Sequence, residues 1–253
     1  MLNKILETKK EEIIALKKKY SSTPLDTNND IQAFYQALSK PDIAIIAEIK
    51  QASPSKGLLT ENFKVGEIAN DYMKGGAAAL SVLTDQQYFA GDPQNIMKAQ
   101  QHCTLPILRK DFIIDPIQVI QSQHLGANAI LLIVAALSPS QLQDLHQMAT
   151  ELKLATLIEC HSEQEIEIAL NCQPQLIGIN NRNLSTFKTN LNTTLQLRKM
   201  LPTGCQVVTE SGIHSLADIK MMLDNNVKCF LIGESLIKSS DRCQAVANYL
   251  KVS

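Results

Sequence analysis

Short apolar runs alternate with longer amphipathic segments from residue 43 to the C-terminus. The apolar runs have the composition of strands buried on both faces, and they span 43–49, 78–82, 106–108, 128–133, 154–159, 176–180, 205–208 and 228–232. Apolar residues at helical spacing follow each run, near 62–74, 93–101, 115–124, 138–149, 162–170, 190–200, 214–224 and 240–250. Several of these segments open with Asp-Pro or Ser-Pro, which is typical of helix starts. The pattern therefore predicts eight βα units in succession.

Regular alternation of strand and helix predicts parallel strands, because each helix carries the chain back to the same end of the sheet. The chain has 253 residues, near the ~250 residues typical of an eight-stranded α/β barrel. The alternative, an open doubly wound sheet, is expected to carry a GxGxxG turn, which we do not find. We therefore expect an α/β fold with a single (β/α)8 TIM barrel over residues 43–253.

The first 42 residues have a different pattern. Residues 1–20 place apolar side chains at helical spacing among Lys and Glu, namely Leu2, Ile5, Leu6, Ile13 and Leu16. Residues 21–30 are rich in Ser, Thr, Asn and Pro and predict a loop, and 31–38 predict a second short helix before Pro41. We expect residues 1–42 to form a helical N-terminal extension.

Charge and composition narrow the range of partners. The chain has 24 basic and 25 acidic residues, so it has no net positive charge to attract nucleic acid. It has no Trp and 4% aromatic residues, which disfavours the stacking of bases on aromatic side chains. It also has no long apolar span. Its six cysteines form no CxxC or zinc spacing, and we find no leader peptide. The sequence predicts a cytoplasmic protein with reduced cysteines, no metal, and no nucleic-acid or membrane partner.

Reactive side chains gather where the predicted strands end, which is the face that carries the active site of an α/β barrel. They are Glu48 and Lys50 after the first strand, Lys110 after the third, Glu159 after the fifth, Asn180 and Arg182 after the sixth, and Glu210-Ser211-Gly212 after the seventh. A single charged strand end is as well explained by a structural ion pair, such as Glu48 with Lys50, which share strand parity. Several reactive side chains on one face of the barrel favour a catalytic site over isolated structural ion pairs.

Two glycines, Gly212 and Gly233, follow the last two strands, where barrels often bind phosphate through backbone N–H groups and a short helix. Glu234 would open that helix, and its carboxylate would have to point away from the anion. Two lysines and several carboxylates in a confined mouth suit proton transfer, since their environments move their pKa values apart. A Schiff base on Lys50 or Lys110 is a competing use of the same residues.

These residues resemble the indole-3-glycerol phosphate synthase family. The resemblance rests on Ile-Ile-Ala-Glu-Ile-Lys-Gln-Ala-Ser-Pro-Ser-Lys-Gly at 45–57 above all, and on motifs at 81–85, 106–116, 177–184, 209–213 and 231–236. It implies ring closure, decarboxylation and dehydration of 1-(2-carboxyphenylamino)-1-deoxyribulose 5-phosphate, without any cofactor. Ile117 stands where relatives often have Tyr, and no proposed catalytic group is missing.

The resemblance also implies roles for individual residues. Lys110 would be the general acid and Glu159 its acid/base partner, while Glu48 and Asn180 would position Lys110 and the substrate, Lys50 would meet an anionic group, and Glu210 the sugar. Arg182 would orient the anthranilate side. Phosphate would be held by Ser53, Ser211, Gly212, Gly233 and Glu234, and the aromatic ring by Phe112, Leu131 and Leu231.

Two alternatives remain at this stage. Phosphoribosylanthranilate isomerase is a similar barrel on a related phosphosugar, but it would use a Cys and an Asp near the first and a later strand end, whereas here the first strand ends in Glu48 and Lys50. A barrel that only binds phosphosugars or a partner is the non-catalytic reading. We expect a monomer, with a weak homodimer as the alternative.

Overall fold

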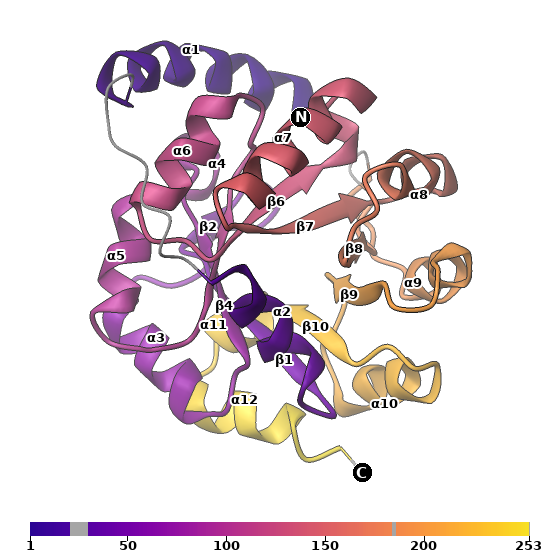
Figure 1. Cartoon of the computed structure of the whole chain (residues 1–253). Coiled ribbons are helices and arrows are strands. Elements are labelled where there is room, and N and C mark those ends of the chain that lie inside the picture. The colour runs from indigo at the N-terminus through magenta and orange to yellow at the C-terminus, as the bar shows by residue number, and fades with distance from the viewer. Residues whose placement is uncertain (21–29, 184–185, 253) are drawn as a thin grey trace.

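The centre of the molecule is a closed barrel of eight parallel strands (Figure 1). The computed structural model describes residues 1–20, 30–183 and 186–252. Around the barrel the strands follow the order β1, β10, β9, β8, β7, β6, β5, β4. Their bounds are β1 Ala44–Ile49, β4 Ala79–Leu83, β5 Ile107–Lys110, β6 Ala129–Ile133, β7 Ala155–Cys160, β8 Leu176–Asn180, β9 Gln206–Glu210 and β10 Cys229–Ile232. The predicted TIM barrel is confirmed.

Helices cover the outside of the barrel (Figure 1). They are α3 Val65–Lys74, α5 Gln94–Gln100, α6 Pro116–His124, α7 Pro139–Glu151, α8 Glu163–Leu170, α9 Asn192–Leu197 with η2 Arg198–Met200, α10 Leu216–Asp224 and α12 Arg242–Tyr249. Asp115 and Ser138 form capping boxes with a proline in the first turn, as the Asp-Pro and Ser-Pro pairs predict. Among the described residues no helix is long and apolar enough to cross a bilayer.

The structure differs from the sequence-based expectation mainly at strand ends. The third and seventh strands continue two residues further than predicted, so that Lys110 and Glu210 are the last residues of β5 and β9. Short elements also appear in the loops, where periodicity is too brief to predict them. They are β2 Ala52–Ser53 paired with β3 Gly57–Leu58, α4 Gln86–Phe89, η1 Val134–Ala136 and α11 Glu234–Ile237, the last of which the sequence did indicate.

Two helices precede the barrel, α1 (Leu2–Tyr20) and α2 (Ile31–Ser39). The predicted loop between them lies outside the described residues, except for Asp30, which caps α2. Phe34 and Leu38 of α2 are fully buried against the apolar interior of the barrel. The Gln206 side chain of β9 donates a 2.7 Å hydrogen bond to the Leu38 carbonyl, so α2 closes the end of the barrel where the strands begin. The helix α1 lies beside α6, as Figure 1 shows.

Strand alternation decides which side chains reach the centre of the barrel. In β1, Ala44 and Ile46 join the interior cluster, while Ile45 and Ile49 pack against the outer helices. Glu48 shares the parity of Ile46 and therefore stands one layer above it, facing inward. The same rule turns Lys110 of β5 inward above Leu108, and Glu159 of β7 inward above Leu157. The upper layer of the interior is thus charged while the lower layers are apolar.

Candidate active site

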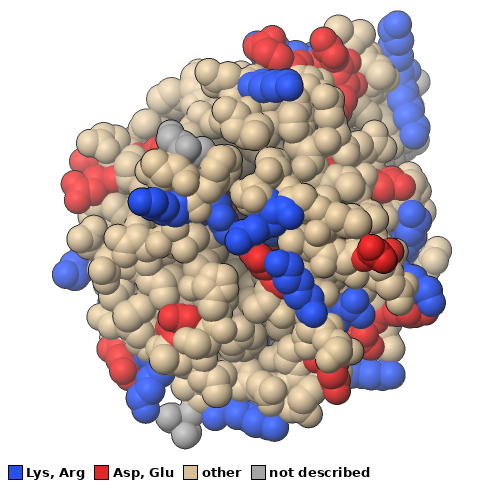
Figure 2. All heavy atoms as spheres, turned by 180° about the vertical axis from the view of Figure 1, so that it is seen from behind, with Lys and Arg blue, Asp and Glu red and all other residues tan. Residues whose placement is uncertain are grey.

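One pocket opens at the carboxyl ends of the strands, and all of the site residues predicted from the sequence line it. They are Glu48, Lys50, Ser53, Lys110, Phe112, Leu131, Glu159, Asn180, Arg182, Glu210, Ser211, Gly212, Leu231, Gly233 and Glu234. Figure 2 shows the molecule from behind the view of Figure 1, with Lys and Arg atoms gathered next to carboxylate residues near the centre of this face. Residues spread over most of the chain therefore share one cavity.

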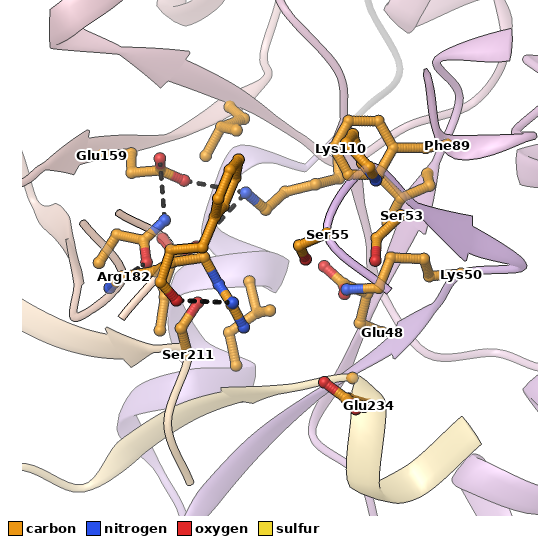
Figure 3. Close-up of a pocket in the computed structure, with 18 of the residues that line it drawn as sticks. Glu48, Lys50, Ser53, Ser55, Phe89, Lys110, Glu159, Arg182, Ser211 and Glu234 are labelled. Atoms are coloured by element: carbon orange, nitrogen blue, oxygen red, sulfur yellow. Dashed lines mark hydrogen bonds and ion pairs between the residues drawn. The ribbon is translucent and has the colours of Figure 1, made fainter. Parts of the chain in front are cut away.

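Lys110 holds the centre of the charged layer. Its Nζ lies 2.9 Å from Oε2 of Glu159 and 3.4 Å from Oε2 of Glu210. The Asn180 amide donates a 3.2 Å hydrogen bond to Oε1 of the same Glu159 (Figure 3). Burial alone would lower the pKa of Lys110, but Glu159 and then Glu210 outweigh it and raise that pKa above its usual value. Lys110 is therefore an ammonium group at neutral pH, with a proton to donate.

The two carboxylates beside Lys110 have opposite pKa shifts. Burial would raise the pKa of Glu159, yet the charge of Lys110 and contact with His161 outweigh burial and lower it. Burial raises the pKa of Glu210, and the nearby Glu159 charge adds to this effect against the opposing one of Lys110. Among the described residues, Oε1 of Glu210 finds no hydrogen-bond partner. One carboxylate is thus held ionised and the other is disposed to carry a proton, an arrangement suited to acid–base chemistry.

Glu48 and Lys50 form an ion pair, as the alternative of a structural ion pair at this strand end predicts. Both side chains nevertheless line the pocket, and Figure 3 shows Lys50 beside Glu48 on the side away from Glu159. Lys50 keeps 17% of its side chain exposed, compared with 6% for Glu48. The pair therefore presents a cation to the cavity and keeps its carboxylate inside.

Two glycines, one within β8 and one directly after β10, make room for these carboxylates. A Cβ atom on Gly178 of β8 would stand 2.2 Å from Oε1 of Glu210, and one on Gly233 would stand 2.4 Å from Oε1 of Glu48. Neither distance is possible for a real side chain, so both positions need glycine for close approach. The sequence indicated Gly233 as a phosphate contact and overlooked Gly178, because the spacing of residues does not show which side chain lies across a neighbouring strand.

The loops after β9 and β10 form the opposite wall of the pocket. Ser211 has a φ of 63° and Gly212 a φ of 88°, so two consecutive residues adopt the left-handed conformation that a serine rarely takes. The Glu234 carboxylate, about a quarter exposed, lies 2.7 Å from Nζ of Lys238 and 3.9 Å from Nζ of Lys56. The two lysines balance the charge of Glu234, so its carboxylate repels a phosphate bound at this loop less.

An apolar wall faces the charged groups. Leu131 and Leu231 belong to the apolar interior of the barrel and also line the pocket. Phe112 lies with its ring centroid 6.1 Å from that of Phe89 in α4. Further lining residues were not foreseen from the sequence, namely Met1, Leu2, Ile5, Phe89, Ile133 and Phe187. Those in α1 and α4 could not be predicted, because no local sequence pattern shows that these two helices contact the barrel.

A buried ionic cluster joins α1 to the barrel next to Lys110. Lys9 is 1% exposed, and its Nζ lies 2.9 Å from Asp85 and 3.0 Å from Asp111. Arg109 donates a 3.0 Å hydrogen bond to Asp111 from the other side. Burial would raise the pKa of Asp111, but Arg109 and Lys9 lower it to about 2. The N-terminal helix is thus tied to the residues on both sides of Lys110 in the chain.

The fold and the site define a class. A TIM barrel with an ammonium group between two carboxylates, set against an apolar wall at the carboxyl ends of the strands, is an enzyme site built for proton transfer on a substrate with an aromatic or other apolar part. The comparison with known families specifies the member of this class.

The Indole-3-glycerol phosphate synthase family matches residues 2–249. The Indole-3-glycerol phosphate synthase of Bordetella pertussis is 47% identical over 249 residues, which cover 95% of each chain. That of Priestia megaterium is 48% identical, covering 97% of this chain and 96% of its own. This chain belongs to the indole-3-glycerol phosphate synthase family, and the resemblance stated from its motifs is confirmed.

Solved structures outside the family share the fold. A 3-hexulose-6-phosphate synthase superposes with a TM-score of 0.65 at 9% identity, over 83% of this chain and 99% of its own. An orotidine 5'-phosphate decarboxylase from Pyrococcus horikoshii superposes with a TM-score of 0.63 at 11% identity, over 81% and 97%. At such low identity these likenesses concern the barrel alone.

Proposed function

We propose that this chain converts 1-(2-carboxyphenylamino)-1-deoxyribulose 5-phosphate to indole-3-glycerol phosphate, a step of tryptophan biosynthesis, and is thus a carboxy-lyase. The observation that carries the proposal is Lys110, held 2.9 Å from Glu159 and 3.4 Å from Glu210 against an apolar wall, in a chain of this family. The reaction closes a pyrrole ring and releases one carbon dioxide and one water, and both ring closure and dehydration need a proton moved within the pocket.

Lys110 acts as the general acid of ring closure. The aromatic carbon that bears the carboxylate attacks the ketone carbon of the sugar chain, and the ketone oxygen takes a proton to become a hydroxyl group. The raised pKa keeps Lys110 protonated at neutral pH, and its ammonium can pass that proton to the ketone oxygen as negative charge develops there. The same raised pKa argues against a Schiff base on Lys110, because a nucleophilic amine must be unprotonated. Loss of carbon dioxide then returns its bonding electrons to the ring.

Glu159 serves the dehydration that follows. The hydroxyl group formed from the ketone leaves as water after protonation, and the neighbouring ring proton is removed to complete the indole. The ionised Glu159 takes up one proton from solvent and passes it to the leaving oxygen. The carboxylate formed again removes the proton of the neighbouring ring carbon and returns it to Lys110 through their hydrogen bond. The nearby Glu210 binds the sugar hydroxyl groups, and Asn180 and Glu48 keep Lys110, Glu159 and the substrate in place.

The remaining pocket residues hold the ends of the substrate. Lys50 meets an anionic group of the substrate, and Arg182 orients the anthranilate side. Phe112, Leu131 and Leu231 pack on the aromatic ring. Ser53 and the backbone of Ser211, Gly212, Gly233 and Glu234 hold the phosphate, and the left-handed conformation at 211–212 together with the neutralised Glu234 supports this placement. We further propose that the enzyme acts in the cytoplasm as a monomer.

The direct test is turnover of the synthetic substrate. Purified protein is mixed with 1-(2-carboxyphenylamino)-1-deoxyribulose 5-phosphate, and formation of indole-3-glycerol phosphate is followed by fluorescence and by carbon dioxide release. Equal amounts of both products are expected. A parallel reaction with phosphoribosylanthranilate separates the isomerase alternative. Turnover of that compound, with none of the first, would replace the proposed function by the isomerase.

A further inference from the structure

His161 lies directly behind Glu159, outside the lining of the pocket, and nothing in the proposed mechanism uses it. It follows β7 by one residue and is 12% exposed. Its Nε2 lies 3.3 Å from Oε1 of Glu159, and its Nδ1 lies 3.1 Å from Oε2 of Glu165. The imidazole ring is therefore held between two carboxylates, one of which belongs to the site.

The first turn of α8 is arranged around this ring. Ser162 caps the helix by accepting a hydrogen bond from the Glu165 backbone N–H. In a capping box the glutamate at this position would return to the Ser162 N–H. Here the Glu165 carboxylate accepts instead a 2.7 Å hydrogen bond from the backbone N–H of His161 and lies beside its ring. The helix start thus fixes the position of His161 through both backbone and side chain.

The geometry also decides the charge of the ring. A neutral imidazole carries one N–H, so one of its nitrogens would face a carboxylate with a lone pair. With Nδ1 bonded to Glu165, only the imidazolium form places positive charge, and not the lone pair of Nε2, beside the Glu159 carboxylate. Burial would lower the pKa of His161, but contact with Glu159 and Glu165 outweighs burial and raises it to about 10. His161 is therefore a buried cation at neutral pH.

We infer that His161 is a positioning residue for the synthase reaction, which as an imidazolium fixes the orientation and the ionised state of the Glu159 carboxylate. The inference rests on the proposed function. Asn180 donates a hydrogen bond to Oε1 and Lys110 to Oε2, and His161 pairs with Oε1 by charge, outside hydrogen-bond geometry, so the three groups hold Glu159 in one orientation. It therefore enters each turnover ionised, ready to share a proton with Lys110.

Other charged groups surround Glu159 and His161, and all of them except Glu165 remain in place in the variants tested below. Facing Glu159 are Lys110 of β5 and Glu210 of β9, and Glu48 of β1 also acts on Lys110 and Glu210 at longer range. Facing His161 are Glu159 of β7 and Glu165 of α8. The Cys160 thiol between them in sequence has a raised pKa through burial and stays neutral. His161 and Lys110 are the cations that lower the pKa of Glu159.

The test compares His161→Gln with His146→Gln. His146 is matched because its Nδ1 lies 2.8 Å from the Thr156 hydroxyl at the opposite end of the same strand, away from the pocket. In His161→Gln, kcat should fall about tenfold at neutral pH, with KM within about twofold, because the ring touches Glu159 and lies outside the pocket lining. The acid limb of the kcat profile should rise by about one pH unit or more, since a cation at this distance lowers a carboxyl pKa by that amount.

A second variant guards against a folding defect. Glu165→Gln keeps the shape of the side chain and removes the charge that stabilises the imidazolium, so the acid limb should move in the same direction by a smaller amount. The His146→Gln profile should match that of the wild type. If the acid limb of the kcat profile is unchanged in both His161→Gln and Glu165→Gln while wild-type turnover is normal, the role assigned to His161 is wrong and the proposed function stands. Absence of wild-type turnover overturns the function itself.

Nuclear magnetic resonance gives a reading of the ring that does not depend on activity. In protein labelled with 15N-histidine, the His161 resonances are assigned by their loss in His161→Gln. Both ring nitrogens should keep the shifts of an imidazolium between about pH 5 and pH 8, whereas an ordinary histidine titrates near about 6.5. A His161 ring that loses its proton near that ordinary value would overturn the inference.

Discussion

The two ends of the barrel are equally buried and chemically opposite. Where the strands begin, α2 inserts Phe34 and Leu38 into an apolar interior, and a few hydrogen bonds between side chains and backbone join it to the barrel. Where the strands end, Glu48, Glu159 and Glu210 are almost as inaccessible as Phe34, yet they are charged or titratable.

This difference shows how one scaffold separates stability from chemistry. Burial of apolar side chains at the closed end stabilises the fold without needing any partner charge. Burial of a carboxylate is costly unless a cation accompanies it, so the open end keeps its charges only through Lys110, Lys50 and His161. The closed end should therefore control unfolding, and the open end turnover.

The largest effect is expected at the centre of the open end. Replacing Lys110→Ala removes the proposed general acid, and kcat should fall by about a thousandfold or more, because general acid catalysis contributes on that order. The fluorescence assay of indole-3-glycerol phosphate measures the change. Lys64→Ala, which removes a surface lysine paired with Glu67, is the matched control and should keep full activity. Undiminished turnover in Lys110→Ala would contradict the assigned role even if the family assignment is right.

At the closed end the same comparison predicts a loss of stability instead. Phe34 is fully buried, so Phe34→Ala leaves a cavity and should lower the free energy of unfolding by about 3–5 kcal/mol. Denaturant titration followed by circular dichroism measures this change, and kcat per folded molecule should stay near that of the wild type. Ile14→Ala, on the exposed face of α1, is the control and should change stability little. A large fall in kcat for Phe34→Ala would mean that the two ends are coupled.

The Lys9 cluster lies between these extremes, since it belongs to the N-terminal helix and contacts the strand that carries Lys110. Lys9→Met leaves Asp85 buried without Lys9 and Asp111 with Arg109 as its remaining cation, and should cost about 3 kcal/mol of unfolding free energy. Lys10→Met removes an exposed pair with Glu7 and should cost less than about 1 kcal/mol. Equal stability of the two variants would show that Lys9 contributes no more than a surface residue.

The same variant has a defined dependence on pH. The pKa of Asp111 is about 2 in the folded protein, below its unfolded value of about 3.9, so the stability it contributes is complete above that unfolded value and is lost as pH falls toward 2. Removing Lys9 raises the folded pKa of Asp111, so acid unfolding of Lys9→Met should begin at a higher pH than in the wild type or Lys10→Met.

Local sequence determined most of the architecture. Strand and helix alternate because apolar residues recur with periods that a buried strand and an amphipathic helix require, and eight such units close a barrel. Strand parity turned Glu48, Lys110 and Glu159 to one side, and parallel direction brought their strand ends to one face. These are consequences of short-range spacing, so they could be predicted residue by residue.

Only the tertiary structure decided which distant groups meet. The sequence does not show that Lys9 reaches Asp85 and Asp111, or that Phe89 of a four-residue helix faces Phe112. Nor does the sequence show that Gly178 and Gly233 make room for the carboxylates of Glu210 and Glu48 from neighbouring strands. His161 stands two residues from Glu159, yet its charge depends on Glu165 in the next helix. Contacts across elements depend on how the chain packs, and local periodicity carries no information about them.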